Sequence, residues 1–294
     1  MESVEQIIEC LAQQRYLADE GLGVSLYLAI QLGRPLLIEG VPGVGKTEVA
    51  KALAASTDRR LIRLQCYEGI DVPQALYEWD FGRQMLTLRA GEASSSEPTP
   101  VDQFFSERFL IERPLLAALR AGSSAVLLID EIDRADDEFE AFLLEFLAEF
   151  QITIPELGTV RAQSPPIVIL TSNRTRDIHD ALKRRCLYHW IDYPSHSLEC
   201  RIIAARAPEV PAKLAEEVVS VVFRFRDLEL LKPPGVAESI DWARGLKIMG
   251  ATSLADSVPV ERTLGLVLKE KDDITRVRRE GTLDAPSYSG WDAR

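Results

Sequence analysis

Short apolar runs alternate with helical patterns along the first two thirds of the chain. The runs are Pro35–Glu39 (PLLIE), Leu61–Gln65 (LIRLQ), Ala125–Asp130 (AVLLID), Ile167–Ser172 (IVILTS) and the weaker Leu187–Ile191 (LYHWI). Runs of this length, bounded by glycine, proline or charge, suit strands that are buried on both faces of a parallel sheet. Because helical segments lie between most of them, the pattern predicts an α/β fold with right-handed crossovers.

The clearest helical pattern covers Asp137–Phe150. Its apolar residues fall at positions 139, 142, 143, 146, 147 and 150, and glutamates occupy the other faces. This spacing predicts an amphipathic helix that packs on the sheet. Its phenylalanines are expected in the core, rather than around a cofactor.

The strand pattern stops after Pro194. Beyond it, helices are expected at Leu198–Val222 and Ser239–Ile248. We therefore predict an α/β domain over residues 1–194 and an all-helical domain over residues 195–280.

Two polar segments predict irregular structure. Gly91–Pro100 (GEASSSEPTP) is rich in serine and proline, so a mobile loop is expected there, within a long insertion between the second and third strands. Gly281–Arg294 is expected to be a frayed tail.

Composition narrows the class of protein. An apolar fraction of 46% in 294 residues is enough for a core. The net charge of −12 argues against direct binding to nucleic acid, which requires a basic footprint. The cysteines form no C-x-x-C pair, the histidines show no zinc spacing, and no signal peptide or membrane span is visible, so a cytoplasmic protein is expected.

The segment from Gly40 to Thr47 matches the phosphate-binding pattern G-x-x-x-x-G-K-[ST] in full. It follows a predicted strand and opens a predicted helix at Thr47–Ala55. Its N–H groups and the helix N-terminus can bind phosphates, Lys46 can reach the β- and γ-phosphates, and Thr47 can bind Mg²⁺. ATP is therefore expected to contact Gly40, Val41, Pro42, Gly43, Val44, Gly45, Lys46, Thr47 and Glu48.

Polar residues lie at the ends of the third and fourth apolar runs. Asp130 and Glu131 follow the third run, where Asp130 would hold Mg²⁺ and Glu131 would polarise the attacking water. Asn173 follows the fourth run, where its amide can hold that water. Taken alone, the acidic pair could be a helix cap and Asn173 a turn residue. Because a complete phosphate loop is present in the same chain, a catalytic role for these residues is favoured over a role in a cap or turn.

A basic cluster, Lys183–Arg184–Arg185, precedes the fifth run. It is either a solvated cluster at a helix C-terminus or the source of an arginine finger for a neighbouring subunit. We favour Arg185 as the finger, with Arg184 as the alternative.

These motifs together resemble an AAA+ ATPase, and further runs resemble the MoxR group, closest to its CoxD type. Those runs are Gln65–Asp71 (QCYEGID), Ala75–Trp79 (ALYEW), Phe150–Gly158 (FQITIPELG), Lys232–Glu238 (KPPGVAE) and Asp241–Arg244 (DWAR). The resemblance covers roughly residues 12–275. It implies a P-loop NTPase core with a five-stranded parallel sheet and a helical lid. It also implies an insert at about 69–113 and a β-hairpin at about 150–163, both facing the centre of a ring.

The resemblance further implies Mg²⁺-dependent ATP hydrolysis by a homo-oligomeric ring, expected to be a hexamer. That ring would remodel a client protein. For the CoxD type the client is an apo-metalloenzyme, the molybdenum-containing carbon monoxide dehydrogenase. A von Willebrand A domain protein is an expected partner, and peripheral association with the inner face of the cell membrane is implied.

Many AAA+ proteins carry a nucleotide-contacting arginine at the start of a lid helix. The matching residues here, 235–239 (GVAES), include none, and Arg244 is the nearest arginine. This departure leaves open an ATP-dependent conformational switch with negligible turnover. A nucleic-acid-directed motor is a weaker alternative, because the chain is acidic.

Overall fold

The computed structural model describes residues 3–94 and 104–280. The chain forms two compact units. The first contains the chain up to Gln14 and residues 18–39 and 46–190; the second contains residues 15–17, 40–45 and the chain from Ile191 on. The predicted domain boundary at Pro194 stays a prediction.

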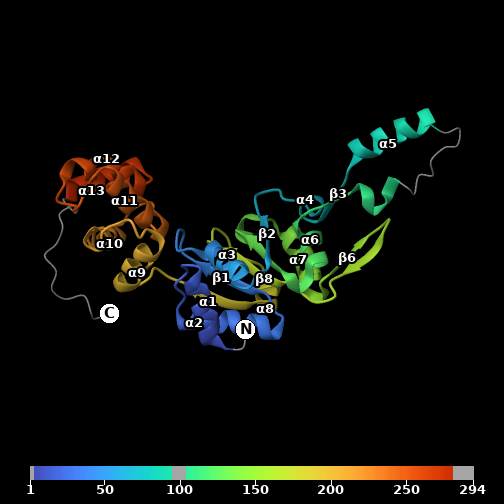
Figure 1. The fold of residues 1–294 in the computed structure, drawn as a ribbon, viewed down its shortest axis with the longest axis horizontal. Helices are drawn as coiled ribbons and strands as arrows, with labels where there is room; N and C mark the ends of the chain where they lie inside the picture. The colour runs from blue at the N-terminus through green and yellow to red at the C-terminus, as the bar shows by residue number, and fades with distance from the viewer. Residues whose placement is uncertain (1–2, 95–103, 281–294) are drawn as a thin grey trace. The chain divides into compact units, whose positions relative to one another are not determined.

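A five-stranded parallel sheet has the order β2-β5-β8-β1-β9. Figure 1 labels three of its strands, β1, β2 and β8. Its strands are β1 Leu36–Gly40, β2 Arg60–Gln65, β5 Ala125–Asp130, β8 Ile167–Ser172 and β9 Leu187–Ile191. All five predicted strands are confirmed within one residue at each end. Residues of β5 and β8 are buried throughout, as expected for strands covered on both faces.

The register of the sheet aligns the carboxyl ends of its strands. Gln65 at the end of β2 lies opposite Asp130 at the end of β5. On β8, Ser172 lies opposite Glu39 of β1. Polar residues that follow separate strands in the sequence therefore meet at one edge of the sheet.

Six helices of the first unit surround the sheet: α1 Val4–Gln13, α2 Glu20–Leu32, α3 Lys46–Ser56, α6 Pro114–Ala121, α7 Asp137–Glu149 and α8 Asp180–Arg185. The amphipathic helix predicted over Asp137–Phe150 is confirmed as α7. Asp136 caps its N-terminus by accepting a hydrogen bond from Phe139 N at 2.9 Å, and Phe150 ends it with a left-handed φ of 47°.

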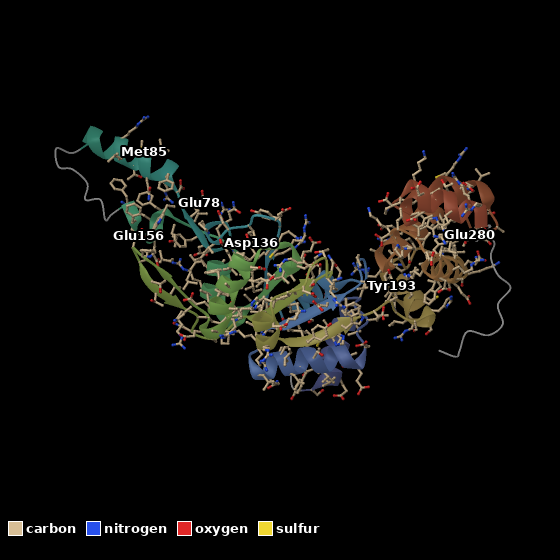
Figure 2. The ribbon with its side chains drawn as sticks, turned by 180° about the vertical axis from the view of Figure 1, so that it is seen from behind. Glu78, Met85, Asp136, Glu156, Tyr193 and Glu280 are labelled. Atoms are coloured by element: carbon tan, nitrogen blue, oxygen red, sulfur yellow. The ribbon has the colours of Figure 1, made fainter. Side chains whose placement is uncertain are left out.

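An insertion follows β2, and a hairpin follows α7. The insertion contains α4 Val72–Leu76, β3 Tyr77–Trp79, α5 Phe81–Ser94, the 3₁₀ turn Glu107–Phe109 and β4 Leu110–Glu112. The hairpin pairs β6 Gln151–Ile154 with β7 Gly158–Arg161. Figure 2 labels Glu78 and Met85 in the insertion and Glu156 at the turn of the hairpin, and the two features lie side by side.

The loop predicted at Gly91–Pro100 is wrong for its first part. Residues 91–94 continue α5, because Glu92 and Ala93 are good helix formers and a helix already formed is easily extended past one glycine. The rest of that prediction, and the tail predicted at 281–294, lie outside the described residues.

The second unit is helical after β9. Its helices are α9 His196–Arg206, α10 Ala212–Asp227, α11 Val236–Ile248, α12 Ser257–Val267 and α13 Lys271–Glu280. The single helix predicted over Leu198–Val222 is wrong, because Pro208 and Pro211 separate α9 from α10. In the described part of the chain, no helix has the length and hydrophobicity to cross a bilayer.

A buried ion pair joins the helices of this unit. Arg226 on α10 donates two hydrogen bonds to Glu199 on α9, at 2.6 and 2.9 Å, and the Glu199 side chain is fully buried. Ser239 on α11 also donates to Glu199, at 2.6 Å. Three helices are therefore connected through one carboxylate, beside a core that contains Phe225 and Trp242.

Candidate nucleotide site

The loop after β1 depends on two glycines. Gly43 has a φ of +76°, and a Cβ placed there would lie 3.0 Å from Gly235 Cα. A Cβ at Gly40 would lie 2.1 Å from the carbonyl oxygen of Ile191. Larger residues are therefore excluded at both positions. Ala237 N donates a hydrogen bond to Gly43 O at 3.1 Å, so this loop contacts the start of α11.

The chain passes from this loop directly into α3, which begins at Lys46. The Lys46 side chain is buried, and burial lowers its pKa to about 8, although Asp133, Asp130 and Glu131 act in the opposite direction. Glu48, also predicted to contact the nucleotide, forms an ion pair with Lys51 at 2.6 Å on the surface of α3.

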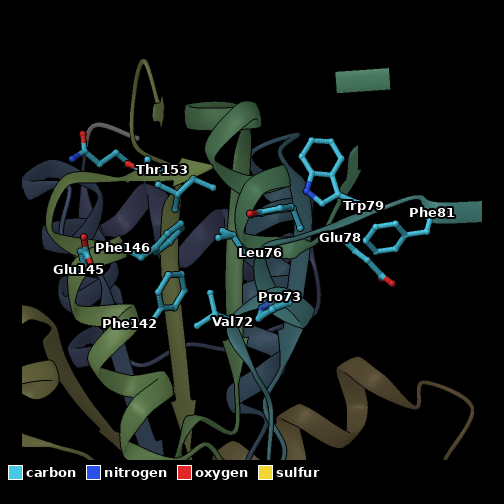
Figure 3. A pocket seen from close by; sticks show the side chains of 13 residues that line it. Val72, Pro73, Leu76, Glu78, Trp79, Phe81, Phe142, Glu145, Phe146 and Thr153 are labelled. Atoms are coloured by element: carbon cyan, nitrogen blue, oxygen red, sulfur yellow. The ribbon is translucent and has the colours of Figure 1, made fainter. Parts of the chain in front are cut away.

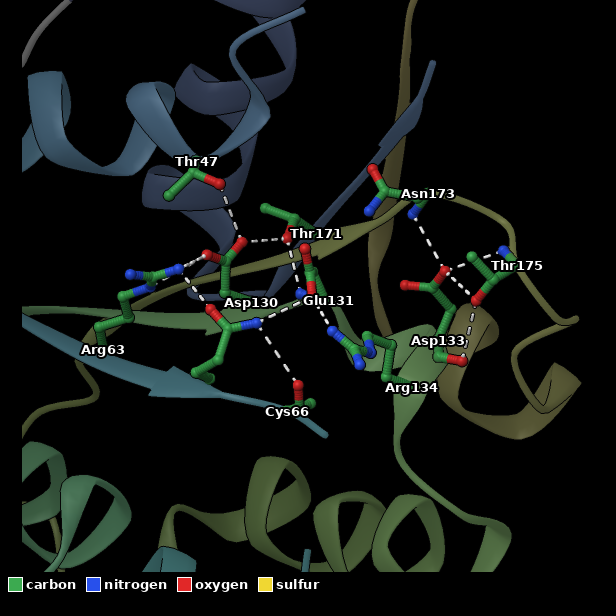
Figure 4. A network of polar contacts seen from close by, with 11 residues as sticks. Thr47, Arg63, Cys66, Asp130, Glu131, Asp133, Arg134, Thr171, Asn173 and Thr175 are labelled. Atoms are coloured by element: carbon green, nitrogen blue, oxygen red, sulfur yellow. Dashed lines mark hydrogen bonds and ion pairs between the residues drawn. The ribbon is translucent and has the colours of Figure 1, made fainter. Parts of the chain in front are cut away.

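Asp130 is the centre of a polar network (Figure 4). Its Oδ1 atom accepts hydrogen bonds from Thr47 Oγ1 at 3.0 Å and from Thr171 Oγ1 at 2.5 Å. Its Oδ2 atom accepts from Arg63, with Nη2 at 2.6 Å and Nε at 3.0 Å. The structure thus places the two predicted metal ligands, Thr47 and Asp130, in direct contact. Two oxygen ligands with further positions left for water and phosphate suit Mg²⁺.

Both the backbone and the side chain of Glu131 form hydrogen bonds. Its backbone has a left-handed φ of 55°, and its N–H donates to Thr171 Oγ1 at 3.0 Å. Its carboxylate accepts a hydrogen bond from Gln65 Nε2 at 3.0 Å and from Arg134 Nη1 at 3.1 Å. The side chain is one third exposed, so water can reach it.

Asn173 lies at the same edge of the sheet. Its backbone N–H donates to Asp133 Oδ2 at 3.2 Å, and its side-chain amide points away from Asp133 (Figure 4). Residues from three strand ends are therefore gathered here: Asp130 and Glu131 after β5, Asn173 after β8, and Lys46 after β1.

Arg184 and Arg185 occupy the last turn of α8, and both are exposed. Arg34 anchors this turn, because its guanidinium donates to the carbonyl oxygens of Arg184 at 2.8 Å and Arg185 at 3.2 Å. Within residues 3–94 and 104–280, neither arginine side chain forms a hydrogen bond or ion pair with another residue. The structure does not bring them into contact with Asp130 or Glu131.

The sequence did not reveal several residues of this network: Arg63, Gln65, Asp133, Thr171 and Thr175. Gln65 and Thr171 lie at or near strand ends, which was a usable signal. Which strands are neighbours, however, is a property of the fold.

A groove of about 500 Å³ lies away from this network, between the insertion and the hairpin (Figure 3). Apolar and aromatic side chains dominate its walls, with Glu78 and Glu145 also present. The lining residues are Val72, Pro73, Leu76, Tyr77, Glu78, Trp79, Phe81, Phe142, Glu145, Phe146, Gln151, Ile152 and Thr153.

Comparisons with known proteins bear on the fold and the family of the chain. The chain is 23% identical over 251 residues to an uncharacterized protein of Staphylococcus saprophyticus, covering 82% of this chain and 86% of that protein. An uncharacterized protein of Staphylococcus aureus is 25% identical over 247 residues, covering 82% of this chain and 85% of that protein.

Among solved structures, the Holliday junction branch migration motor RuvB of Thermotoga maritima matches with a TM-score of 0.50 and 18% identity, covering 93% of this chain and 74% of that one. At this identity the likeness shows the fold alone. The profile of the ATPase family associated with various cellular activities (AAA) matches residues 36–191. Because that match spans more than half of the 294 residues, the chain belongs to the AAA ATPase family.

Proposed function

We propose that this protein hydrolyses ATP in the presence of Mg²⁺, at the sheet edge where Thr47 and Asp130 meet. The observation that carries the proposal is their hydrogen bond of 3.0 Å, beside Glu131 and Asn173. A hydroxyl and a carboxylate on neighbouring elements form the protein part of a magnesium site in P-loop NTPases. The bound Mg²⁺ would neutralise charge on the phosphate oxygens.

The protein side chains would share the remaining work. Lys46 binds the β- and γ-phosphates, together with the backbone N–H groups of the loop Gly40–Gly45, in which Pro42 has none. Glu131 accepts a proton from the attacking water, and Gln65 holds the carboxylate at 3.0 Å. The Asn173 amide orients the same water against the γ-phosphate.

A neighbouring subunit would complete the site with Arg185, or with Arg184. Their exposed side chains have no partner in the described part of the chain, although Arg34 fixes the backbone that carries them. Such an arrangement suits a finger that acts in trans, which stabilises charge on the transferred phosphoryl group. It requires a ring, for which we propose six copies.

The work done by hydrolysis would be the remodelling of a client protein. The resemblance to the MoxR group and its CoxD type supports maturation of a molybdenum-containing carbon monoxide dehydrogenase, with a von Willebrand A domain protein as a partner. The apolar groove between the insertion and the hairpin is the surface that we propose for gripping an unfolded client segment. Contact with the membrane would then be made through these partners.

The test is the ATPase rate per subunit, measured over a range of protein concentrations after preincubation with MgATP. A rate that rises steeply with concentration supports sites completed by neighbours. Bound ATP with no turnover at any concentration, with or without an added client, would refute hydrolysis and favour the alternative below.

The alternative is a nucleotide-dependent switch with negligible turnover. The observation that favours it is the first turn of α11, where Glu238 accepts a hydrogen bond from Gly235 N at 3.0 Å and no arginine is present. Client binding that requires ATP occupancy but is unchanged by blocking hydrolysis would support it. Retention on single-stranded DNA at moderate salt would instead revive a nucleic-acid-directed motor.

A further inference from the structure

One carboxylate of the site has no part in the roles assigned so far. Asp133 follows the strand β5 by three residues, and its side chain is only 2% exposed. Its Oδ2 atom accepts hydrogen bonds from Asn173 N at 3.2 Å, Thr175 N at 2.9 Å and Thr175 Oγ1 at 2.7 Å. All three donors come from the turn that follows β8.

That turn has a demanding backbone conformation. Arg174, between the two donating N–H groups, has a φ of 57°, a left-handed value that is unfavourable for a residue with a side chain. Two N–H groups that converge from either side of such a residue form an anion-binding concavity. The Asp133 carboxylate fills that concavity and stabilises the turn that carries Asn173.

The second oxygen of Asp133 makes the arrangement unusual. Its Oδ1 atom is buried and has no hydrogen-bond partner in the described residues. A buried carboxylate oxygen without a donor is destabilising, and native proteins rarely keep one without reason. The nearby ammonium of Lys46 offsets part of that cost, since Asp133 is the carboxylate that most strongly favours the charged form of Lys46.

The opposite turn is tied to the same sheet edge. Glu131 also has a left-handed φ, of 55°, and its N–H is held by Thr171 on β8 at 3.0 Å. Asp133 lies two residues after Glu131, and it grips the backbone of Asn173. The turn after β5 is thus hydrogen-bonded to β8 through Thr171, and the turn after β8 is hydrogen-bonded to Asp133.

We propose that Asp133 is a positioning residue that fixes the Asn173 amide relative to the Glu131 carboxylate. The inference rests on the proposed ATPase function and deepens it. It assigns Asp133 no contact with the nucleotide. Residues that hold a functional group in place without contacting the ligand typically contribute 10- to 100-fold to activity.

The test is a double-mutant cycle on kcat and KM for MgATP, with Asp133→Ala, Asn173→Ala and the double variant. If Asp133 acts through Asn173, Asp133→Ala lowers kcat about 10- to 100-fold, by more than the loss of its support for the Lys46 ammonium raises KM, and it adds almost nothing to the kcat loss when Asn173 is already alanine. Multiplying losses, or a loss confined to KM, would overturn the proposal.

Two further variants control for folding. Asp133→Asn keeps an oxygen that can accept from the same N–H groups, so it should recover most of the kcat lost in Asp133→Ala. Asp137→Asn changes a carboxylate that is 87% exposed, four residues away, and should leave kcat unchanged. Failure of the asparagine variant to recover activity while it remains folded would count against the positioning role.

Amide hydrogen exchange separates this inference from the proposed function. In the wild-type protein the N–H groups of Asn173 and Thr175 should exchange slowly, and at least tenfold faster in Asp133→Ala, with Glu131 N unchanged. Rapid exchange at both positions in the wild type would overturn the inference. If the wild type hydrolyses ATP no faster than Glu131→Gln, the proposed function fails. Slow exchange of the Asn173 and Thr175 N–H groups would still show that Asp133 fixes the turn after β8.

Discussion

Gln65 donates a hydrogen bond from its side-chain amide to the Glu131 carboxylate, with 3.0 Å between Nε2 and Oε2. The two residues end neighbouring strands of the sheet, β2 and β5. This hydrogen bond restrains the orientation of the Glu131 carboxylate.

Replacing that carboxylate should separate binding from turnover. We expect Glu131→Gln to bind MgATP with wild-type affinity but to hydrolyse it 10²- to 10⁴-fold more slowly, the usual contribution of a general base. Nucleotide retention on the purified variant, analysed as ATP or ADP, measures this. Normal turnover would remove Glu131 from the mechanism.

The finger can be tested by mixing variants. We expect Arg185→Ala to lower kcat about 10³-fold and leave ATP affinity intact, because the residue acts on a neighbour. Mixing Arg185→Ala with Glu131→Gln should restore activity, since interfaces between the two variants include complete sites. Arg184→Ala is the matched variant. No recovery on mixing, with rings formed, would argue against action in trans.

The burial of Lys46 predicts how ATP affinity depends on pH. Its pKa of about 8 in the nucleotide-free protein means that the ammonium is mostly charged at pH 7 and mostly neutral at pH 9. Phosphate groups favour the charged form, so ATP binding above pH 8 must take up a proton, and affinity falls as pH rises. We expect the Kd for MgATP to rise about tenfold from pH 7 to pH 9. Calorimetric titration measures it, and Lys46→Arg should lose this dependence.

The cysteines give a prediction on reactivity. Burial raises the pKa of Cys66 and of Cys186 to about 12, so almost no thiolate is present at pH 8. We expect both thiols to resist alkylation in the native protein and to react once it is unfolded. Rapid labelling of Cys66 in the native protein would show that its thiol is accessible and would contradict this prediction.

The buried ion pair of the helical unit should matter to stability. Glu199→Ala leaves the Arg226 guanidinium buried without its partner, which typically costs 3–5 kcal/mol. Urea unfolding followed by far-UV circular dichroism measures this. The exposed pair of Arg244 with Glu209 is the matched control, and Glu209→Ala should cause no resolvable change.

Predictions from the sequence succeeded where the signal is local. The buried strands show as apolar runs, and the helix α7 shows as an apolar periodicity over Asp137–Phe150. The break between α9 and α10 is also local, at Pro208 and Pro211, although apolar residues continue on both sides of it.

The network around Asp130 was not predictable in the same way. Arg63 and Thr171 reach Asp130 only because β2 and β8 lie on either side of β5, an order that no single segment encodes. Asp133 is equally dependent on the fold, because its partners lie 40 and 42 residues away in the turn after β8.

The position of the groove between the insertion and the hairpin connects it to the proposed site of ATP hydrolysis. Its lining begins at Val72, seven residues after Gln65, and its other wall is α7, which begins four residues after Asp133. Each wall is thus connected by a few residues to a residue of the polar network. Gln65 contacts the Glu131 side chain, and Asp133 contacts the backbone of Asn173. A bound polypeptide segment that moves the two walls apart would displace both connecting segments together. The rate of the proposed ATP hydrolysis would then depend on what the groove binds.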